Sequence, residues 1–343
     1  MEEPEQDAGQ KQSFRAIFAA EPNGPPGRLV RIRRDELPDE AVTVRVGFSS
    51  LNYKDALAVS GKGRVVRRFP MVCGVDLAGE VEASRDPSWL AGDRVIATGW
   101  GLGDEHWGGY SELARVRPEW LVAIPGDRDA LWAMSLGTAG LTAMLSVLAL
   151  EHHDVRPDAA GDWPLVVTGA GGGVGSVAVA LLAELGYKVT AVSGRPENEA
   201  YLKGLGASEV LNRSELADAP PRALDRERFA GGVDVVGGST LANVLSQTRW
   251  GGCVAACGLV GGADLPTTVH PFILRGVTLA GIDSVRVPLG LRERAWQRLV
   301  SDLPPAVIEE MTVVEPLEKV PELAEQILAG RTRGRVAIEV SAL

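Results

Sequence analysis

The chain has few of the residues that build disulfide frameworks and metal clusters. Its 343 residues include 3 cysteines and 4 histidines. Three cysteines are too few for a disulfide framework in a chain of this length, so we expect a reducing setting. Cys253 and Cys257 lie in an apolar segment typical of a central parallel strand, where buried thiols usually act as small hydrophobic side chains. We therefore predict that no metal ion binds at these two cysteines.

An excess of basic charge and long hydrophobic runs are also missing. The chain has 35 lysines and arginines against 45 aspartates and glutamates, and its formal net charge is -10. A nucleic-acid surface would need a basic stripe, so this balance argues against one. No run approaches the about eighteen consecutive apolar residues of a membrane span, and the polar start is unlike a signal peptide. We expect a soluble cytoplasmic protein with neither a membrane nor a nucleic-acid partner.

The length of the chain and the pattern of its strands predict two domains. Residues 1–12 are polar and acidic and are predicted to be disordered. A strand-rich, partly barrel-like domain is predicted over residues 13–136, and the tail, residues 284–343, is assigned back to it. The segments behind this prediction are strand-like at 13–18, 42–50, 79–82, 93–97 and 334–340, and helical at 291–303 and 320–329.

Residues 137–283 are predicted to form an α/β nucleotide-binding domain. Apolar strand-like segments occur at 165–168, 188–192, 209–211, 233–236, 252–256 and 278–282, with helical segments between most of them. Parallel strands with intervening helices make a doubly wound sheet, the Rossmann fold. In such a sheet the ligand binds at the carboxyl ends of the strands, where the strand order reverses.

The glycine-rich turn at residues 169–175 is the most informative motif. It follows the apolar strand at 165–168 and opens a helix expected over 176–185. Glycines permit a tight turn and a close approach of the backbone to phosphates, while the helix N-terminus offers free N–H groups. The turn therefore predicts a pyrophosphate site. Its candidate contacts are Thr168, Ala170, Gly172, Gly173 and Val174.

The end of the next predicted strand distinguishes between the two nicotinamide cofactors. It carries Ser193, Gly194 and Arg195. An acidic residue at this place would bind the ribose 2′-hydroxyl of NAD, whereas a hydroxyl and a guanidinium suit the 2′-phosphate of NADPH. We therefore predict an NADPH site. A solvated surface arginine is the alternative interpretation of Arg195.

Longer motifs give the chain a family resemblance. The turn Ala170-x-Gly172-Gly173-x-Gly175 resembles that of zinc-independent medium-chain dehydrogenases/reductases, which are related to quinone reductases. Further blocks resemble the acryloyl-CoA reductases; they are residues 49–57 (SSLNYKDAL), 61–63 (GKG), 107–109 (WGG), 137–144 (GTAGLTAM), 253–259 (CVAACGL) and 265–269 (LPTTV).

The resemblance implies a GroES-like catalytic domain and a Rossmann domain. The activity it implies is NADPH-dependent reduction of the acryloyl-CoA double bond to propanoyl-CoA, without a metal. It also implies that Tyr53, Leu259 and Ser284 lie by the cofactor and that the chain forms a homodimer. Zinc alcohol dehydrogenases of the same superfamily have a histidine near the position of Val75 and clustered cysteines between residues 97 and 108. This chain has neither, so both ligand sets for tetrahedral zinc are missing.

The chemistry implied for this family needs a hydride and a proton. A thioester carbonyl makes the β-carbon of a conjugated double bond an acceptor for hydride from the cofactor. The resulting enolate needs hydrogen-bond donors and a proton at its α-carbon. Tyr53 is the candidate proton donor. Alternatively its ring packs against the cofactor or the core, and solvent supplies the proton.

The substrate and the function each leave alternatives open. Arg64, Arg67 and Arg68 lie beside the turn at residues 61–63 and could bind the phosphates of a coenzyme A thioester, or they could form a solvated basic loop. A quinone reductase that uses NADPH is the nearest enzymatic alternative. A cofactor-binding protein of crystallin type, without activity, is the other alternative, because fold alone does not decide between these functions.

Overall fold

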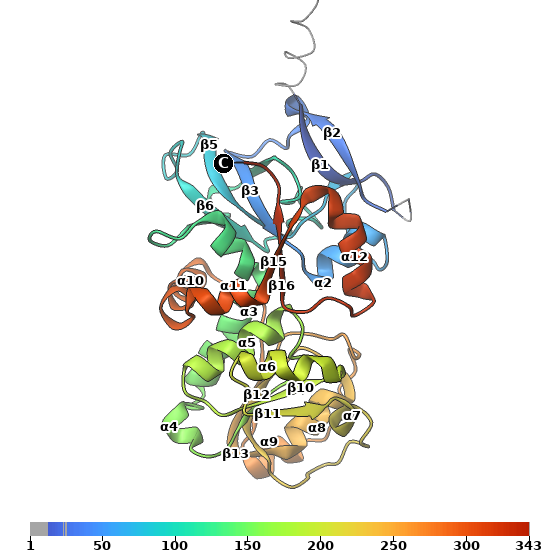
Figure 1. The fold of residues 1–343 in the computed structure, drawn as a ribbon, viewed down its shortest axis with the longest axis vertical. Coiled ribbons are helices and arrows are strands. Elements are labelled where there is room, and N and C mark those ends of the chain that lie inside the picture. The colour runs from blue at the N-terminus through green and yellow to red at the C-terminus, as the bar shows by residue number, and fades with distance from the viewer. Residues whose placement is uncertain (1–12, 23, 25, 343) are drawn as a thin grey trace, which may run out of the picture. The chain divides into compact units, whose positions relative to one another are not determined.

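The structure is a computed structural model that describes residues 13–22, 24 and 26–342. The predicted disorder of residues 1–12 lies outside the described residues. The chain divides into two compact units (Figure 1). Unit 1 comprises Met1–Thr138, Val285–Glu293 and Thr312–Leu343, and unit 2 comprises Ala139–Ser284 and Arg294–Met311.

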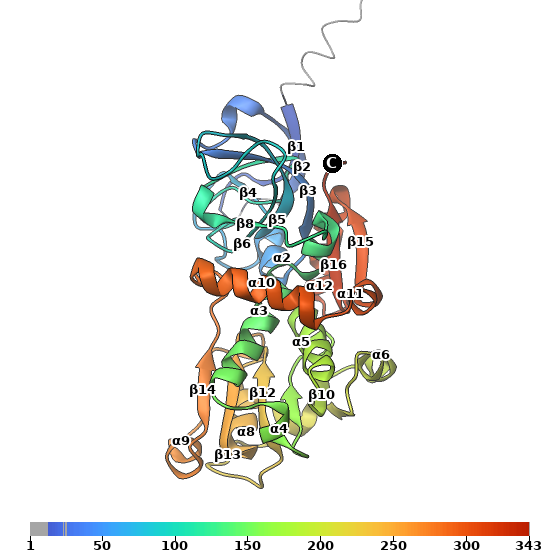
Figure 2. The same ribbon diagram turned by 90° about the vertical axis from the view of Figure 1, so that its left-hand side faces the viewer.

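Unit 2 contains a six-stranded parallel sheet in the order β11-β10-β9-β12-β13-β14. Its strands are β9 (Leu165–Val167), β10 (Val189–Ser193), β11 (Glu209–Asn212), β12 (Phe229–Asp234), β13 (Thr248–Ala256) and β14 (Thr278–Gly281). Figure 2 shows β14, β12 and β10 in this order across the unit. Because the chain runs outward from β9 and then from β12 in opposite directions, the order reverses between these two strands. The predicted Rossmann fold is confirmed.

Helices connect the strands, and the short helix α4 (Pro157–Ala160) precedes the first of them. The connecting helices are α5 (Gly173–Glu184), α6 (Glu199–Gly204), α7 (Ser214–Ala217), α8 (Gly238–Gln247) and α9 (His270–Arg275). Fully buried Val166 in β9, Val254 in β13 and Leu245 in α8 belong to one apolar core cluster. The continuous apolar runs of the strands are explained by this burial, because both faces of a doubly wound sheet are covered.

Strand β12 begins earlier than the predicted strand at 233–236. Gly231 and Gly232 form its centre, and a Cβ at either position would clash with a carbonyl oxygen, that of Cys253 or that of Val166. The glycines therefore let β12 lie close to both neighbouring strands. They also remove the apolar side chains by which a strand is recognised in a sequence.

Unit 1 is built from two sheets. The larger has seven strands in the order β15-β16-β3-β5-β6-β8, with β7 also paired to β3, and the smaller has the order β2-β1-β4. The strands are β1 (Ser13–Ala19), β2 (Arg28–Arg33), β3 (Val42–Ser50), β4 (Met71–Val72), β5 (Asp76–Ser84), β6 (Arg94–Thr98), β7 (Leu113–Val116), β8 (Leu121–Ala123), β15 (Thr312–Pro316) and β16 (Arg335–Glu339). Except for the parallel pair β15 and β16, the neighbouring strands are antiparallel. The predicted strand-rich domain is confirmed.

Helix α2 (Tyr53–Ser60) follows β3 directly and packs against α12 (Val320–Leu328) (Figure 1). The alternating residues Val42, Val44 and Val46 of β3 are fully buried in the core of this unit, and so is Val320 of α12. Their burial explains why the C-terminal segment returns to unit 1.

Residues 294–311 differ from the predicted boundary, which placed all of 284–343 with the catalytic domain. They include most of α10 (Leu289–Asp302) and all of α11 (Pro305–Met311), and they cluster with unit 2. The Arg298 guanidinium donates to both carboxylate oxygens of Glu151 at 2.9 and 2.8 Å. A contact between residues so far apart in sequence leaves no trace in local periodicity.

Helix α3 (Ala130–His152) is long and apolar enough to cross a membrane by length and composition. However, 89% of its most apolar 18-residue window is buried inside the protein, as expected of a core helix. Gly137 interrupts its helical geometry with φ 53°. This helix is weak evidence for a membrane span.

Candidate active site

The glycine turn lies at the carboxyl end of β9, where the strand order of unit 2 reverses. The backbone turns at Gly169, which has a φ of 57°, and Gly172 is the N-cap of α5. The Ala170 N–H donates to the Val192 carbonyl at 3.1 Å, which joins the turn to β10. The turn therefore occupies the place where doubly wound sheets bind ligands.

Two glycines of the turn leave no room for a side chain. An ideal Cβ at Gly175 would lie 2.7 Å from the Ala170 Cα, and one at Gly171 would clash with the Asn198 amide. In contrast, Gly172 is exposed, and Gly173 and Val174 are half-buried. The N-terminus of α5 is thus held close to β9 and open to a ligand. This cradle fits a pyrophosphate group.

The Thr168 side chain joins the ends of two strands. Its hydroxyl donates to Asp234 Oδ1 at 2.7 Å and accepts a hydrogen bond from the Val235 N–H at 3.1 Å. Asp234 Oδ2 accepts from the Gly237 N–H at 2.7 Å. Burial raises the pKa of Asp234, and these hydrogen bonds oppose that rise. Asp234 was not among the predicted site residues, although an acid at the end of an apolar strand is a recognisable signal.

The predicted 2′-phosphate residues lie beside the glycine turn. Ser193 ends β10, and its hydroxyl accepts hydrogen bonds from the Arg195 N–H at 3.2 Å and from Asn198 Nδ2 at 3.4 Å. Arg195 Nη2 lies 3.6 Å from the position of an ideal Cβ at Gly171. The structure therefore brings the arginine and the pyrophosphate cradle together.

A second arginine, which the sequence pattern did not reveal, lies at the same strand end. An ideal Cβ at Gly194 would lie 2.5 Å from Arg213 Cδ and 2.7 Å from Arg213 Nε. The Arg213 N–H also donates to the Ser193 carbonyl at 2.9 Å. Its sequence signal is a basic residue directly after β11, the strand next to β10. Two guanidinium groups thus lie at the end of β10.

Leu259 and Ser284 follow the carboxyl ends of β13 and β14. Leu259 lies in the loop after β13 and is 66% exposed. The Ser284 hydroxyl accepts a hydrogen bond from Thr142 at 2.8 Å. Because the sheet is parallel, these residues belong to the same edge as the glycine turn and Ser193.

Tyr53 lies in unit 1, at the first position of α2, and 41% of its surface is exposed. Asn52 is the N-cap, and it forms a capping box with Asp55: the Asn52 N–H donates to Asp55 Oδ2 at 2.9 Å. Such a box fixes the direction in which a helix starts. The phenol of Tyr53 has no hydrogen-bond partner within the described part of the chain.

Two buried carboxylates lie beneath this helix start. Asp55 and Asp76 are both fully buried, and Asn52 Nδ2 donates to both at 3.0 Å. Asp76 also accepts hydrogen bonds from the Ser50 hydroxyl and from the hydroxyl and N–H of Thr138. Asp55 Oδ1 accepts from the Val75 N–H at 2.8 Å.

Arg335 and Gly137 complete this network. Arg335 is 1% exposed, and its guanidinium donates to the Ser135 carbonyl at 2.9 Å and to Asn52 Oδ1 at 3.3 Å. An ideal Cβ at Gly137 would lie 2.6 Å from Asp76 Oδ2 and 3.1 Å from Arg335 Nη2. A buried arginine beside two buried carboxylates offsets part of their charge. The sequence analysis did not predict Asp76 or Arg335 as site residues. Each is a charged residue next to apolar residues in the sequence, Asp76 within an apolar segment and Arg335 at the start of one.

Burial, together with the neighbouring Asp76, raises the pKa of Asp55 to about 7, while hydrogen bonds from Val75 and Asn52 lower it. Burial also raises the pKa of the Cys73 thiol to about 12. Cys73 is therefore protonated at neutral pH and is no nucleophile.

The three arginines predicted for the substrate differ in their surroundings. Arg67 forms an ion pair with Glu105 at 2.6 Å. Arg64 and Arg68 are both exposed, and Arg68 also lines a cavity in unit 1. The binding of a substrate phosphate by these three arginines therefore stays a prediction.

A zinc ion does not fit the residues present. Within residues 13–22, 24 and 26–342, no group of three or more histidine, cysteine, aspartate or glutamate side chains could hold a metal ion. Val75 also lacks any ligating atom at the position where zinc alcohol dehydrogenases have histidine.

The chain matches two family models. Residues 38–126 match the alcohol dehydrogenase GroES-like domain, and residues 173–301 match a model described as zinc-binding dehydrogenase. The GroES-like character expected of unit 1 is therefore confirmed.

Curated relatives narrow the family. The probable acrylyl-CoA reductase AcuI of Escherichia coli is 54% identical over 89% of this chain and 93% of its own length. The acrylyl-CoA reductase AcuI of Ruegeria pomeroyi is 51% identical over 90% and 92%. The putative quinone oxidoreductase YhfP of Bacillus subtilis is 45% identical over 90% and 93%. The chain belongs to the medium-chain dehydrogenases/reductases and, within them, to the family of the acrylyl-CoA reductases.

Solved structures agree with this assignment. The yhdH oxidoreductase of Salmonella enterica, in complex with NADP, has a TM-score of 0.92 and 49% identity, covering 96% of this chain and 100% of that one. The Bacillus subtilis protein yhfP, with NAD bound, has a TM-score of 0.91 and 42% identity, covering 95% and 99%.

We predict that Asp55→Asn changes the pH dependence of stability. Because the pKa of Asp55 is about 7 in the folded protein and 3.8 in the reference state, the folded state retains the proton at pH values where the unfolded state has lost it. The stability of the wild type relative to Asp55→Asn should therefore fall as the pH rises from about 5 to about 8, by up to about 3 kcal/mol. Urea unfolding at several pH values measures this difference.

The exposed residue Asp264 provides the control, since Asp264→Asn should leave the pH profile unchanged. A stability difference between wild type and Asp55→Asn that stays constant with pH would contradict the raised pKa.

Proposed function

We propose that this protein reduces the carbon–carbon double bond of acryloyl-CoA to propanoyl-CoA with NADPH. The observation that carries the proposal is the 54% and 51% identity to curated acrylyl-CoA reductases over about nine-tenths of the chain. Arg195 and Arg213 at the end of β10 support NADPH as the cofactor, because both guanidinium groups suit a 2′-phosphate.

The residues proposed to hold the cofactor lie along one edge of the unit 2 sheet. The backbone of Ala170, Gly172, Gly173 and Val174 would bind the pyrophosphate, and Thr168 would position this edge through Asp234. Ser193, Gly194 and Arg195 would bind the 2′-phosphate, and Leu259 and Ser284 would contact the cofactor farther along the edge. When bound, NADPH supplies the hydride that adds to the β-carbon of the thioester.

Tyr53 is proposed as the catalytic acid that gives a proton to the α-carbon of the enolate. Tyr53 is exposed, and its hydroxyl makes no hydrogen bond to the residues that the structure describes, so it is available to a substrate. The capping box of Asn52 and Asp55 holds the residue at the start of α2. A hydrogen-bond donor at this position would also stabilise the developing oxyanion.

Two further features of the protein are proposed from its family. It acts as a homodimer in the cytoplasm. Residues 13–136 and 284–343, apart from 294–311, form its catalytic domain, and residues 137–283 form its Rossmann domain, with which 294–311 cluster. The acyl-CoA substrate is consistent with the curated relatives.

The quinone reductase and the inactive cofactor-binding protein remain testable alternatives, the first because the Bacillus subtilis relative is named a putative quinone oxidoreductase. We predict that NADPH absorbance falls fastest when the protein is mixed with acryloyl-CoA, more slowly with crotonoyl-CoA, and little with a simple quinone. Oxidation with the quinone alone would favour the quinone reductase. Binding of NADPH without oxidation by any of the three would favour the inactive protein.

We predict that Arg195→Ala and Arg213→Ala each weaken NADPH binding and leave NADH binding unchanged. A charge-assisted contact to phosphate contributes about 1.5–3 kcal/mol, so the Kd for NADPH should rise about 10- to 100-fold. Fluorescence titration with both cofactors measures the effect. Arg226, which is exposed in unit 2 and makes no side-chain ion pair in the described structure, is the control as Arg226→Ala. Equal losses for NADPH and NADH would contradict the 2′-phosphate assignment.

We predict that Tyr53→Phe lowers kcat with acryloyl-CoA by more than about tenfold, because the phenol can no longer donate a proton. Steady-state kinetics at saturating NADPH measure kcat. The melting temperature should not change, since the hydroxyl has no bond to lose within the described residues. An unchanged kcat would remove Tyr53 from the mechanism and assign the proton to solvent.

A further inference from the structure

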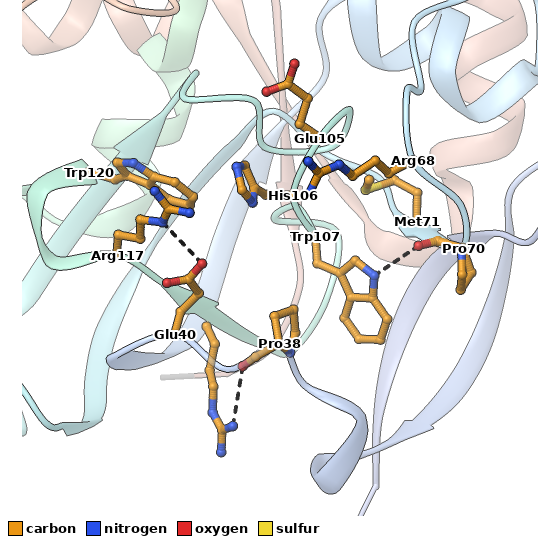
Figure 3. Close-up of a pocket in the computed structure, with 11 residues that line it drawn as sticks. Pro38, Glu40, Arg68, Pro70, Met71, Glu105, His106, Trp107, Arg117 and Trp120 are labelled. Atoms are coloured by element: carbon orange, nitrogen blue, oxygen red, sulfur yellow. Dashed lines mark hydrogen bonds and ion pairs between the residues drawn. The ribbon is translucent and has the colours of Figure 1, made fainter.

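A cavity in unit 1 combines aromatic rings with arginines. Its volume is about 320 Å³, within the range of small-molecule sites. The rings of His106, Trp107 and Trp120 and the side chain of Arg68 line it, and Figure 3 shows them arranged around one space. The cavity thus offers flat surfaces together with a cation.

The charges around this cavity leave a positive excess. Glu40 forms an ion pair with Arg117 at 3.2 Å, and Glu105 forms one with Arg67 at 2.6 Å. No carboxylate in the described part of the protein pairs with Arg68. The pKa of His106 is lowered, mainly because the ring is partly buried and also because the positive charge of Arg117 is near. The cavity is therefore suited to an anion, although the whole chain is acidic.

The rings differ in how far they are open to a ligand. Those of His106 and Trp107 are half-buried, whereas Trp120 is buried. The His106 and Trp120 rings are tilted by 57° with centroids 4.7 Å apart, and the Arg117 guanidinium lies 5.1 Å from the Trp120 ring centre. The half-buried Trp107 is held by a hydrogen bond from its Nε1 to the Pro70 carbonyl at 3.1 Å. Aromatic rings beside guanidinium groups are surfaces on which nucleobases bind.

The cavity is connected to the start of α2 by direct contacts. Lys54, which follows Tyr53, forms an ion pair with Asp104. The Asp104 carbonyl accepts hydrogen bonds from the N–H groups of Arg67 and Arg68, at 2.8 and 3.3 Å. The cavity residues Glu105 and His106 follow Asp104 in the chain. A substrate that reaches both Tyr53 and this cavity must be long.

We propose that this cavity binds the phosphorylated adenosine end of the coenzyme A thioester, with Arg68 at a phosphate and the half-buried rings of His106 and Trp107 against the base. This assignment rests on the proposed function, which supplies the acyl-CoA. A purine that carries phosphates matches both halves of the cavity, its rings and its unpaired cation. Neither the acryloyl group nor a quinone has such an anion.

Binding of adenosine 3′,5′-bisphosphate tests the assignment directly. Calorimetry is carried out with saturating NADP⁺, so that the cofactor site cannot take up the probe. The wild type should bind it, and Arg68→Ala should bind it about tenfold more weakly. Arg28 is exposed in unit 1 and does not line this cavity, so Arg28→Ala should bind like the wild type. Equal binding of the bisphosphate by Arg68→Ala and wild type, or binding of inorganic phosphate to the wild type as tight as that of the bisphosphate, would overturn the assignment.

Kinetics separate this inference from the proposed function. Arg68→Ala should raise KM for acryloyl-CoA about tenfold and leave KM for acryloyl-pantetheine, which lacks the nucleotide, as in the wild type. If the wild type reduces acryloyl-CoA but Arg68→Ala does so with the same KM, the cavity assignment fails and the function stands. If the wild type does not reduce acryloyl-CoA, the proposed function fails.

Discussion

The close approach of α5 to the end of β9 is the constraint on which the nucleotide-binding unit depends. Gly175 lies so near the Ala170 backbone that a Cβ would be 2.7 Å from the Ala170 Cα. This contact places the helix N-terminus at the point where the strand order reverses, and it leaves Gly172 exposed to a ligand. Arg195 and Arg213 at the neighbouring strand end then provide positive charge where a phosphorylated ribose would lie. The preference for a phosphorylated cofactor thus follows from the two arginines that lie at the strand end beside the glycine turn.

Unit 1 contains a second organising element, the buried group around Asn52. Its amide donates to Asp55 and Asp76 and accepts from Arg335, so one side chain connects the cap of α2, strand β5 and strand β16. Charges this deeply buried are stable only when they are hydrogen-bonded and paired. The network therefore holds Tyr53 at a defined place, and burial within it raises the pKa of Asp55.

Much of the fold was predictable because its signals are local. Apolar strands, the glycine turn and the Ser193–Arg195 strand end predicted the Rossmann sheet and its cofactor edge, and the motif around Tyr53 indicated the family. Features set by contacts between distant residues were not predictable. Arg213 lies over Gly194 only after β11 pairs with β10, and Arg335 reaches Asn52 across most of the chain length. The start of β12 was not predicted either. Its glycines give no apolar signal in the sequence, and their fit depends on the backbones of the neighbouring strands.

In the proposed reaction the protein moves a hydride from NADPH to the β-carbon of an acryloyl thioester. Reduction with NADPH that carries deuterium at the transferred C4 position tests it most directly, with nuclear magnetic resonance of the propanoyl-CoA formed. We predict one deuterium at the β-carbon and, in ordinary water, none at the α-carbon. Propanoyl-CoA without deuterium at the β-carbon, or deuterium at the α-carbon, would contradict the account.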